Sequence, residues 1–191
     1  MSVVPKHRPV NKIDARSSVE LSNEKIAIVF FEVVRNRLQH VNSWPIIAEN
    51  LATTFQLANK EGIEVYRKAK EGDFVKMIIE SPESKNFSSV NWNRIQSLTD
   101  ISNNDGIDSF GFNLTKCNGP INWKKDGVHH SNDSLCEFIV ARTGKIVTAS
   151  ILEIGKDAEG AEIRKNAIGT TGSSALVHID WQKLANGLIS R

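Results

Sequence analysis

Residues 135–154, LCEFIVARTGKIVTASILEI, decide the fold that this sequence predicts. Two largely apolar runs, 135–142 and 145–154, flank Thr143 and Gly144. Runs joined by two residues, one of them glycine, are typical of a β-hairpin, because glycine readily adopts the positive φ that a tight turn requires. The stretch therefore predicts two neighbouring antiparallel strands.

Upstream of this hairpin, short runs with a period of two begin near Thr53 and are separated by turn residues. This pattern predicts an antiparallel sheet. The expected strands are 54–58, 63–69, 73–80, 92–99 and 107–116, with a less regular one at 13–20. Residues 59–62 would form a hairpin loop between the first two, and the polar runs 81–91 and 117–134 would be surface loops.

The strand DFVKMIIE, 73–80, is apolar on both faces. Val75, Met77 and Ile79 would point to one side, and Phe74 and Ile78 to the other, which is typical of a central strand. Gly72 precedes this strand and Pro82 follows it. These residues either end the strand or begin a ligand loop, and the sequence leaves both interpretations open.

Helices are predicted before and after the sheet. Ser22 or Asn23 would cap the first, whose apolar residues recur at helical spacing: Ile26, Val29, Phe30, Val33, Val34, Leu38 and Val41. Ser43 would cap a shorter helix through Ile46, Ile47 and Leu51, with Pro45 in its first turn. A C-terminal helix is indicated by the stripe Val177, Trp181, Leu184 and Leu188.

Length and composition indicate an ordinary globular protein. The chain has 191 residues, 40% of them hydrophobic and 24% charged, with a net charge of +2. We expect a tail at 1–12 and a single α+β domain at 13–191. No signal-peptide apolar region or membrane-length apolar run occurs, so we expect a cytoplasmic protein without membrane insertion. Nothing in the charge pattern indicates a nucleic-acid partner.

No complete catalytic or cofactor motif is present in the sequence. His129 and His130, near Asp126 and Asp133, form the densest titratable cluster, but adjacent residues of an extended segment point opposite ways. Cys117 and Cys136 are expected to be small hydrophobic residues in or beside strands. The run 169–174, GTTGSS, could hold an anion or could precede the last helix. We therefore expect no bound metal and no cofactor, and the sequence favours a protein that is not an enzyme.

Several short motifs resemble a small uncharacterised bacterial family. They are Gly72-Asp73-Phe74-Val75 and Val90-Asn91-Trp92, then 138–144 (FIVARTG), 164–166 (RKN) and 181–184 (WQKL) followed by Gly187-Leu188. The chain departs from that family at Asn91, where an aspartate is usual, and in having fewer glycines before Trp92. The resemblance implies no known activity.

The order of predicted elements is similar to the helix-grip fold of START-like and polyketide-cyclase-like proteins. In that fold a curved antiparallel sheet encloses a C-terminal helix and an apolar cavity, with six strands after the N-terminal helices. The sequence predicts seven strands there, so one of them would have to be absent. A small β-barrel with added helices is the alternative architecture.

The leading functional hypothesis is noncatalytic binding of a small apolar or amphipathic molecule, such as a lipid, in a cavity between sheet and helices. The expected wall residues are Trp92, Phe110 and Phe112, with Arg94 and Arg142 as polar contacts. One alternative is a protein–protein interaction module whose long loops or exposed sheet face engage another protein, which a filled core with an exposed patch at Trp123 would favour. Another is an enzyme that works through loop residues.

Overall fold

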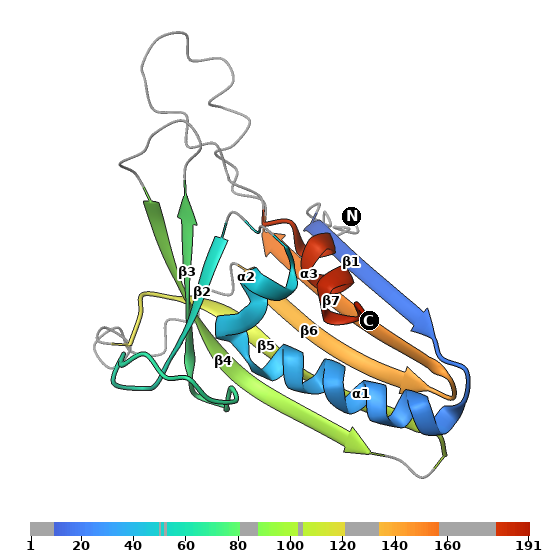
Figure 1. Ribbon diagram of the computed structural model, residues 1–191. Helices are drawn as coiled ribbons and strands as arrows, with labels where there is room; N and C mark the ends of the chain where they lie inside the picture. Colours follow the sequence, from blue (N-terminus) through green and yellow to red (C-terminus); the bar gives the residue numbers. More distant parts are fainter. Residues whose placement is uncertain are drawn as a thin grey trace, which may run out of the picture.

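The computed structural model describes residues 10–49, 51, 53–80, 88–102, 105–120, 134–156 and 179–191. Within this part of the chain, seven strands form one antiparallel sheet in the order β1-β7-β6-β5-β4-β3-β2 (Figure 1). The strands are β1 (Val10–Glu20), β2 (Thr53–Ala58), β3 (Phe74–Glu80), β4 (Ser88–Ser102), β5 (Ile107–Cys117), β6 (Ser134–Thr143) and β7 (Ile146–Lys156). The sheet is open, because β1 and β2 lie at its opposite edges.

The helices cover one face of this curved sheet (Figure 1). They are α1 (Glu24–Gln39), the 3-10 turn η1 (Val41–Ser43), α2 (Trp44–Ile47) and the C-terminal α3 (Trp181–Leu188). Asn23 caps α1, since its side-chain oxygen accepts a hydrogen bond from the backbone N–H of Ile26 at 3.0 Å. The α+β class and the helix-grip-like order of elements are therefore confirmed, and a closed barrel is not formed.

Aromatic rings fill the space between the sheet and the short helices. The Trp44 ring lies 5.2 Å from that of Phe55, 6.2 Å from that of Phe112 and 4.9 Å from that of Phe138, centroid to centroid. Trp181 of α3 meets Phe138 edge-on at 5.4 Å. Trp44 donates its indole N–H to the carbonyl of Leu38, so the polar end of this buried ring is satisfied. This cluster forms the centre of the core.

The predicted strand 63–69 is wrong. Only an isolated bridge joins Glu64 to Ala58, and the segment otherwise runs as a loop. Val65 N–H donates to the Leu57 carbonyl at 2.9 Å, but the Asn42 amide replaces the return bond: its oxygen accepts from Leu57 N–H at 2.6 Å, and its nitrogen donates to the Val65 carbonyl at 2.9 Å. The pairing with β2 therefore does not continue as a regular ladder. Six strands thus follow the helices in the described chain, which is the helix-grip number.

The predicted orientation of α1 is wrong in part. Its buried residues are Ala27, Phe31, Val34, Leu38 and Gln39. Ile26, Val29 and Val33 were expected in the core, but they are 46%, 66% and 40% exposed. The helix carries more apolar residues than one buried face can hold.

Three element boundaries also differ from the prediction. The second helix is a single turn that ends before Leu51, since Glu49 adopts a positive φ of 43°, and Ser43 makes no side-chain cap bond. Strand β4 begins at Ser88, inside the predicted loop 81–91, because residues 88–91 pair with β3. The β6–β7 turn is centred on Gly144 and Lys145, one residue later than predicted, and Gly144 has a φ of 59°.

Side chains near the C-terminus connect the two ends of the described chain. Arg37 of α1 donates to the carbonyls of Leu188 and Ser190 at 2.9 and 2.5 Å. The Gln182 amide exchanges two hydrogen bonds with the backbone of Arg16 on the edge strand β1. These bonds satisfy backbone groups that an edge strand would otherwise expose. No helix in the described residues is long and apolar enough to cross a membrane.

Candidate functional site

Trp92 lies in a surface pocket where β5 leaves β4. The pocket has a volume of about 410 Å³ and is lined by Val90, Asn91, Trp92, Lys116, Cys117 and Asn118. Trp92 pairs with Cys117 in the last described step of the β4–β5 ladder, so the two strands separate just beyond this pair. Because neighbouring residues on a strand alternate between faces, Trp92 points away from the face that carries the core residues Val75 and Ile95.

A basic group lies beside the ring of Trp92. The ammonium of Lys76, its cross-strand neighbour on β3, lies 6.0 Å from the ring centroid, a cation–π contact. Lys116 also lines the pocket, but it pairs with Asn93 and so starts on the opposite face of the sheet from Trp92; none of the described lining residues is acidic. The pocket therefore offers one aromatic ring beside a positive charge in a largely polar lining, which suits a molecule with an aromatic part and an anionic part.

Gly119 holds Trp92 in position. A methyl group at Gly119 would lie 3.1 Å from Cδ1 of the Trp92 ring, and the residue has a φ of +92°, which favours glycine. The backbone of Gly119 thus packs directly against one side of the indole. The next residue, Pro120, lies close to Gly62 in the loop after β2: a methyl group at Gly62 would lie 3.3 Å from Cγ of Pro120.

The thiol of Cys117 is not activated as a nucleophile. Burial raises its pKa, and a hydrogen bond from the Gly119 backbone and the positive charge of Arg94 offset only part of that rise. Burial also raises the pKa of Cys136 well above its usual range, helped by Glu153 and Glu137. A reactive cysteine requires a lowered pKa, and neither of these two thiols has one. Both lie in strands, as predicted.

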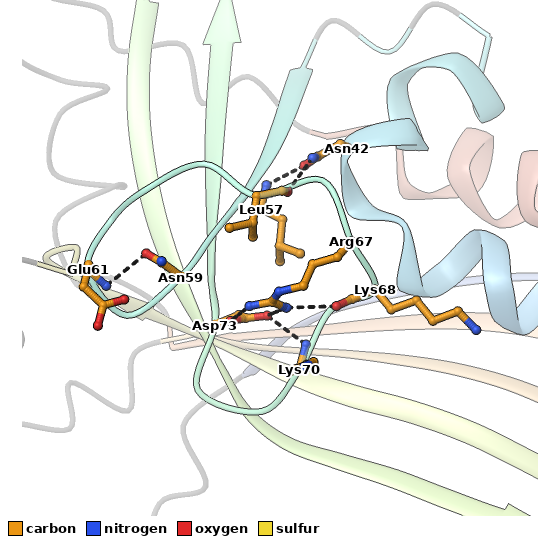
Figure 2. Close-up of polar contacts among 9 residues, drawn as sticks. Asn42, Leu57, Asn59, Glu61, Arg67, Lys68, Lys70 and Asp73 are labelled. Atoms are coloured by element: carbon orange, nitrogen blue, oxygen red, sulfur yellow. Dashed lines mark hydrogen bonds and ion pairs between the residues drawn. The ribbon is translucent and has the colours of Figure 1, made fainter.

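A polar network secures the loop 59–73 beside this region (Figure 2). Two nitrogens of Arg67 hold the two carboxylate oxygens of Asp73 at 2.6 and 2.9 Å. Asp73 also accepts from the backbone N–H of Lys70 at 2.9 Å, and Arg67 donates to the Lys68 carbonyl. The hydrogen bond to Asp73 raises the pKa of Arg67. Gly72 and Asp73, which precede β3, therefore hold the loop 59–73 in place; we call these two residues the anchor.

The anchor connects the loop to β4. Gly72, with a φ of +87°, donates its N–H to the Ile95 carbonyl at 2.9 Å, and Ile95 donates back to Asp73 at 2.8 Å. The Arg94 guanidinium lies 3.7 Å from where a Gly72 side chain would begin. Arg94 thus sits between the loop and the Cys117 side of the pocket, outside the pocket lining itself.

The structure places the other predicted site residues in the core. Phe110 and Phe112 are buried on the helix-facing side of β5, and Phe112 stacks on Trp44 and Phe138. Arg35 of α1 covers the Phe110 ring at 5.1 Å. Neither phenylalanine lines the Trp92 pocket. These residues and Trp92 lie on opposite faces of the sheet and do not form one site.

Arg142 also makes contacts within the fold. Its Nε donates to Asp108 at 2.6 Å and its Nη1 donates to the Gly144 carbonyl at 3.0 Å. The side chain is 5% exposed, and that of Asp108 is 15% exposed. The guanidinium is thus buried and held by Asp108 and Gly144 at the β5–β6–β7 end of the sheet, and Arg142 is not among the residues that line the Trp92 pocket.

Of the five predicted site residues, Trp92 lines this pocket, whereas Lys76 and Gly119, which contact its ring, were not predicted. No motif marks Lys76. Only the strand register could have identified it, because a correct pairing of β3 with β4 places Lys76 beside Trp92. The predictions for Trp123, His129, His130, residues 169–174 and Val177 lie outside the described residues. Within the described residues, no group of three or more metal-ligating side chains is present.

Another pocket lies between α2 and α3. It measures about 270 Å³ and is lined by Ile47, Ala48, Glu49, Lys183, Asn186, Gly187 and Ser190. Its described lining contains no aromatic ring, and Glu49 and Lys183 carry opposite charges. It exposes more apolar surface than the Trp92 pocket does, but it offers no ring on which a flat ligand could stack.

No protein-family model matches the chain, and no curated protein does. The resemblance to an uncharacterised bacterial family therefore stays a prediction. Among solved structures, the chain is similar to the crystal structure of Ara h 8.0201, with 9% sequence identity, a TM-score of 0.41 and coverage of 95% of this chain and 96% of that chain. At this TM-score, the likeness carries no weight for the function.

Proposed function

We propose that the protein binds a small amphipathic molecule without catalysing its reaction, and that the Trp92 pocket holds it. The observation that carries this proposal is the half-buried Trp92 ring in a pocket of about 410 Å³, with the ammonium of Lys76 6.0 Å from the ring centroid. Pockets of roughly 300–1,000 Å³ with an apolar wall and a few polar groups are typical of small-molecule sites. A flat ring would stack on the indole, and an acidic group would meet the ammonium.

This location differs from the one that the sequence suggested. The helix-facing side of the sheet is filled in its described part by Trp44, Phe112 and Phe138, which leaves the outer pocket as the better candidate. Arg94 supports the proposal as a nearby positive charge, since its charge acts on Cys117 in the pocket lining. Phe110, Phe112 and Arg142 have structural roles in this proposal.

The test uses two fluorescent probes that differ in charge. The first is 1-anilinonaphthalene-8-sulfonate, which is aromatic and anionic; the second, N-phenyl-1-naphthylamine, has the same rings and no charge. Trp92→Ala should weaken both, because stacking on an aromatic side chain contributes about 1–3 kcal/mol. Lys76→Ala should weaken the anionic probe more than the neutral one, because it removes the ammonium beside the ring. Lys145→Ala, an exposed change at the β6–β7 turn, is the matched control.

Native mass spectrometry of the purified protein, followed by denaturing extraction, would identify a ligand that copurifies. Recovery of an amphipathic acid whose retention depends on Trp92 would support the proposal. Equal probe affinity in the wild type and in Trp92→Ala would remove the pocket as the binding site.

A further inference from the structure

Helix α1 exposes an apolar row on the side opposite the sheet. Ile26, Val29 and Val33 are 46%, 66% and 40% exposed, and they follow one another at helical spacings of three and four. Their side chains lie in a row about 10 Å long, since an α-helix rises about 1.5 Å per residue. In Figure 1, α1 lies over the helix-covered face of the sheet, with α2 and α3 to its side.

This row is more apolar than a solvent-facing helix needs. The buried face of α1 is already supplied by Ala27, Phe31, Val34 and Leu38, so the exposed row adds nothing to the core. A helix that is apolar on both faces is usually covered on both. Contiguous exposed apolar groups flanked by charges mark interaction surfaces.

The charges at the ends of the row specify the partner. Lys25 lies at its N-terminal end and Glu32 near its C-terminal end, and both are exposed. Lys25 makes no ion pair with a described residue, whereas Glu32 keeps 54% of its side-chain surface exposed beside Arg35. The row thus has a positive end and a negative end.

A two-fold axis through Val29 makes this row complementary to itself. In an antiparallel pair of α1 helices, Val29 meets Val29 of the other copy and Ile26 faces Val33. Lys25 then faces Glu32, and the symmetry repeats each contact on the other side of the axis. The midpoints of both pairs lie within half a residue of Val29, as an isologous interface requires.

We infer that a second copy of this chain docks antiparallel on the exposed row of α1. Apolar contact at Val29 holds the two copies together, and the two Lys25–Glu32 pairs fix the direction of the helices. The row is short, and stable interfaces usually bury about 1,200–2,000 Å² in total. The dimer is therefore weak and forms with rising protein concentration.

Sedimentation velocity across a range of concentrations tests the pairing through charge reversal. Lys25→Glu places two acidic groups face to face, and Glu32→Lys places two basic groups face to face, so each variant should dimerise roughly tenfold more weakly. An equimolar mixture of the two should regain dimers, because both contacts then join Glu to Lys. Val29→Arg should abolish dimers, while circular dichroism confirms that every variant is folded.

Lys68→Glu is the matched control, since it reverses an exposed charge outside α1 and should leave the dissociation constant unchanged. A wild-type protein that stays monomeric at every concentration would overturn the inference, whether the row is bare or covered by another part of the chain. Dimers that survive Val29→Arg, or a mixture of the charge variants that does not dimerise better than either alone, would overturn it as well.

Discussion

Gly187 of α3 packs directly on the carbonyl of Ile47 at the end of α2: a methyl group at residue 187 would lie 2.2 Å from that oxygen. The two helices can approach this closely only because residue 187 has no side chain. Glycine inside a helix normally lowers stability by about 0.5–1 kcal/mol relative to alanine. At residue 187 the close contact with Ile47 should instead make glycine more favourable than alanine.

Gly187→Ala should therefore destabilise the protein by about 1–3 kcal/mol, because the backbone of α2 has to move to make room. Urea unfolding followed by far-UV circular dichroism gives the change. Lys183→Ala, one turn earlier and exposed, should change stability by less than about 0.5 kcal/mol. A more stable Gly187→Ala variant would show that α3 does not pack on Ile47 in solution.

Trp181 joins α3 to the sheet through its ring and through its N–H. Its ring meets Phe138, and its indole nitrogen donates to Glu153 at 2.6 Å. Trp181→Ala should cost about 3–5 kcal/mol, because the change opens a large cavity in the core. Trp181→Phe keeps most of the ring and should cost less, about 1–2 kcal/mol for the lost hydrogen bond. A loss within about 0.5 kcal/mol for Trp181→Ala would contradict its place in the core.

Removal of Arg67 should loosen the loop 59–73. The Asp73 side chain is 7% exposed, whereas that of Arg67 is 35% exposed. Water therefore reaches the guanidinium but hardly reaches the carboxylate. Arg67→Ala should cost about 1–3 kcal/mol, since it leaves a buried carboxylate without its cation. Arg67→Lys should recover little, because a single ammonium cannot make both contacts. Hydrogen exchange of the Lys70 and Gly72 amides would report the loosening, and unchanged protection of both would contradict it.

The two functional interpretations of Arg142 predict different results. As a structural residue, it should lower stability by about 2–4 kcal/mol when replaced by alanine, because Asp108 is left buried without its partner. Probe binding at Trp92 should then stay the same under conditions where the variant is folded. Weaker probe binding with unchanged stability would instead indicate that Arg142 contacts the ligand.

The two cysteines should differ in reactivity. Burial raises the pKa of both thiols, and that of Cys136 more strongly, so both carry little thiolate at neutral pH. Modification by Ellman's reagent should accelerate as the pH rises, and Cys136 should react at least roughly tenfold more slowly than Cys117. Cys117→Ser and Cys136→Ser isolate the two rates. A ligand in the Trp92 pocket should slow Cys117 alone.

Much of the fold could be predicted from the sequence, because alternation and turn residues are local signals. The strand at 107–117 was predicted nearly to its ends, and Phe110, Phe112 and Leu114 share one buried face as expected. The prediction for 63–69 failed for a non-local reason, since the Asn42 amide, from another part of the chain, replaces one hydrogen bond between Leu57 and Val65. Local alternation cannot report such a contact.

The candidate site was harder to predict than the fold. An aromatic strand residue has the same sequence pattern whether it lines a cavity or fills a core, so Phe110 and Trp92 were grouped together although they face opposite sides. The exposed row on α1 was assigned to the core for a related reason. Periodicity identifies which residues share a face of a helix, but not which of two apolar faces turns toward the sheet.

The pairing of β1 with β7 has a consequence for how this protein folds. Glu20 finds its ladder partner in Ile146, and no other described strand pairs with β1. During synthesis the first strand emerges long before its partner, and contacts between distant parts of a chain form slowly. The first strand can therefore pair only after β7 has been made, so β1 joins the edge of the sheet late.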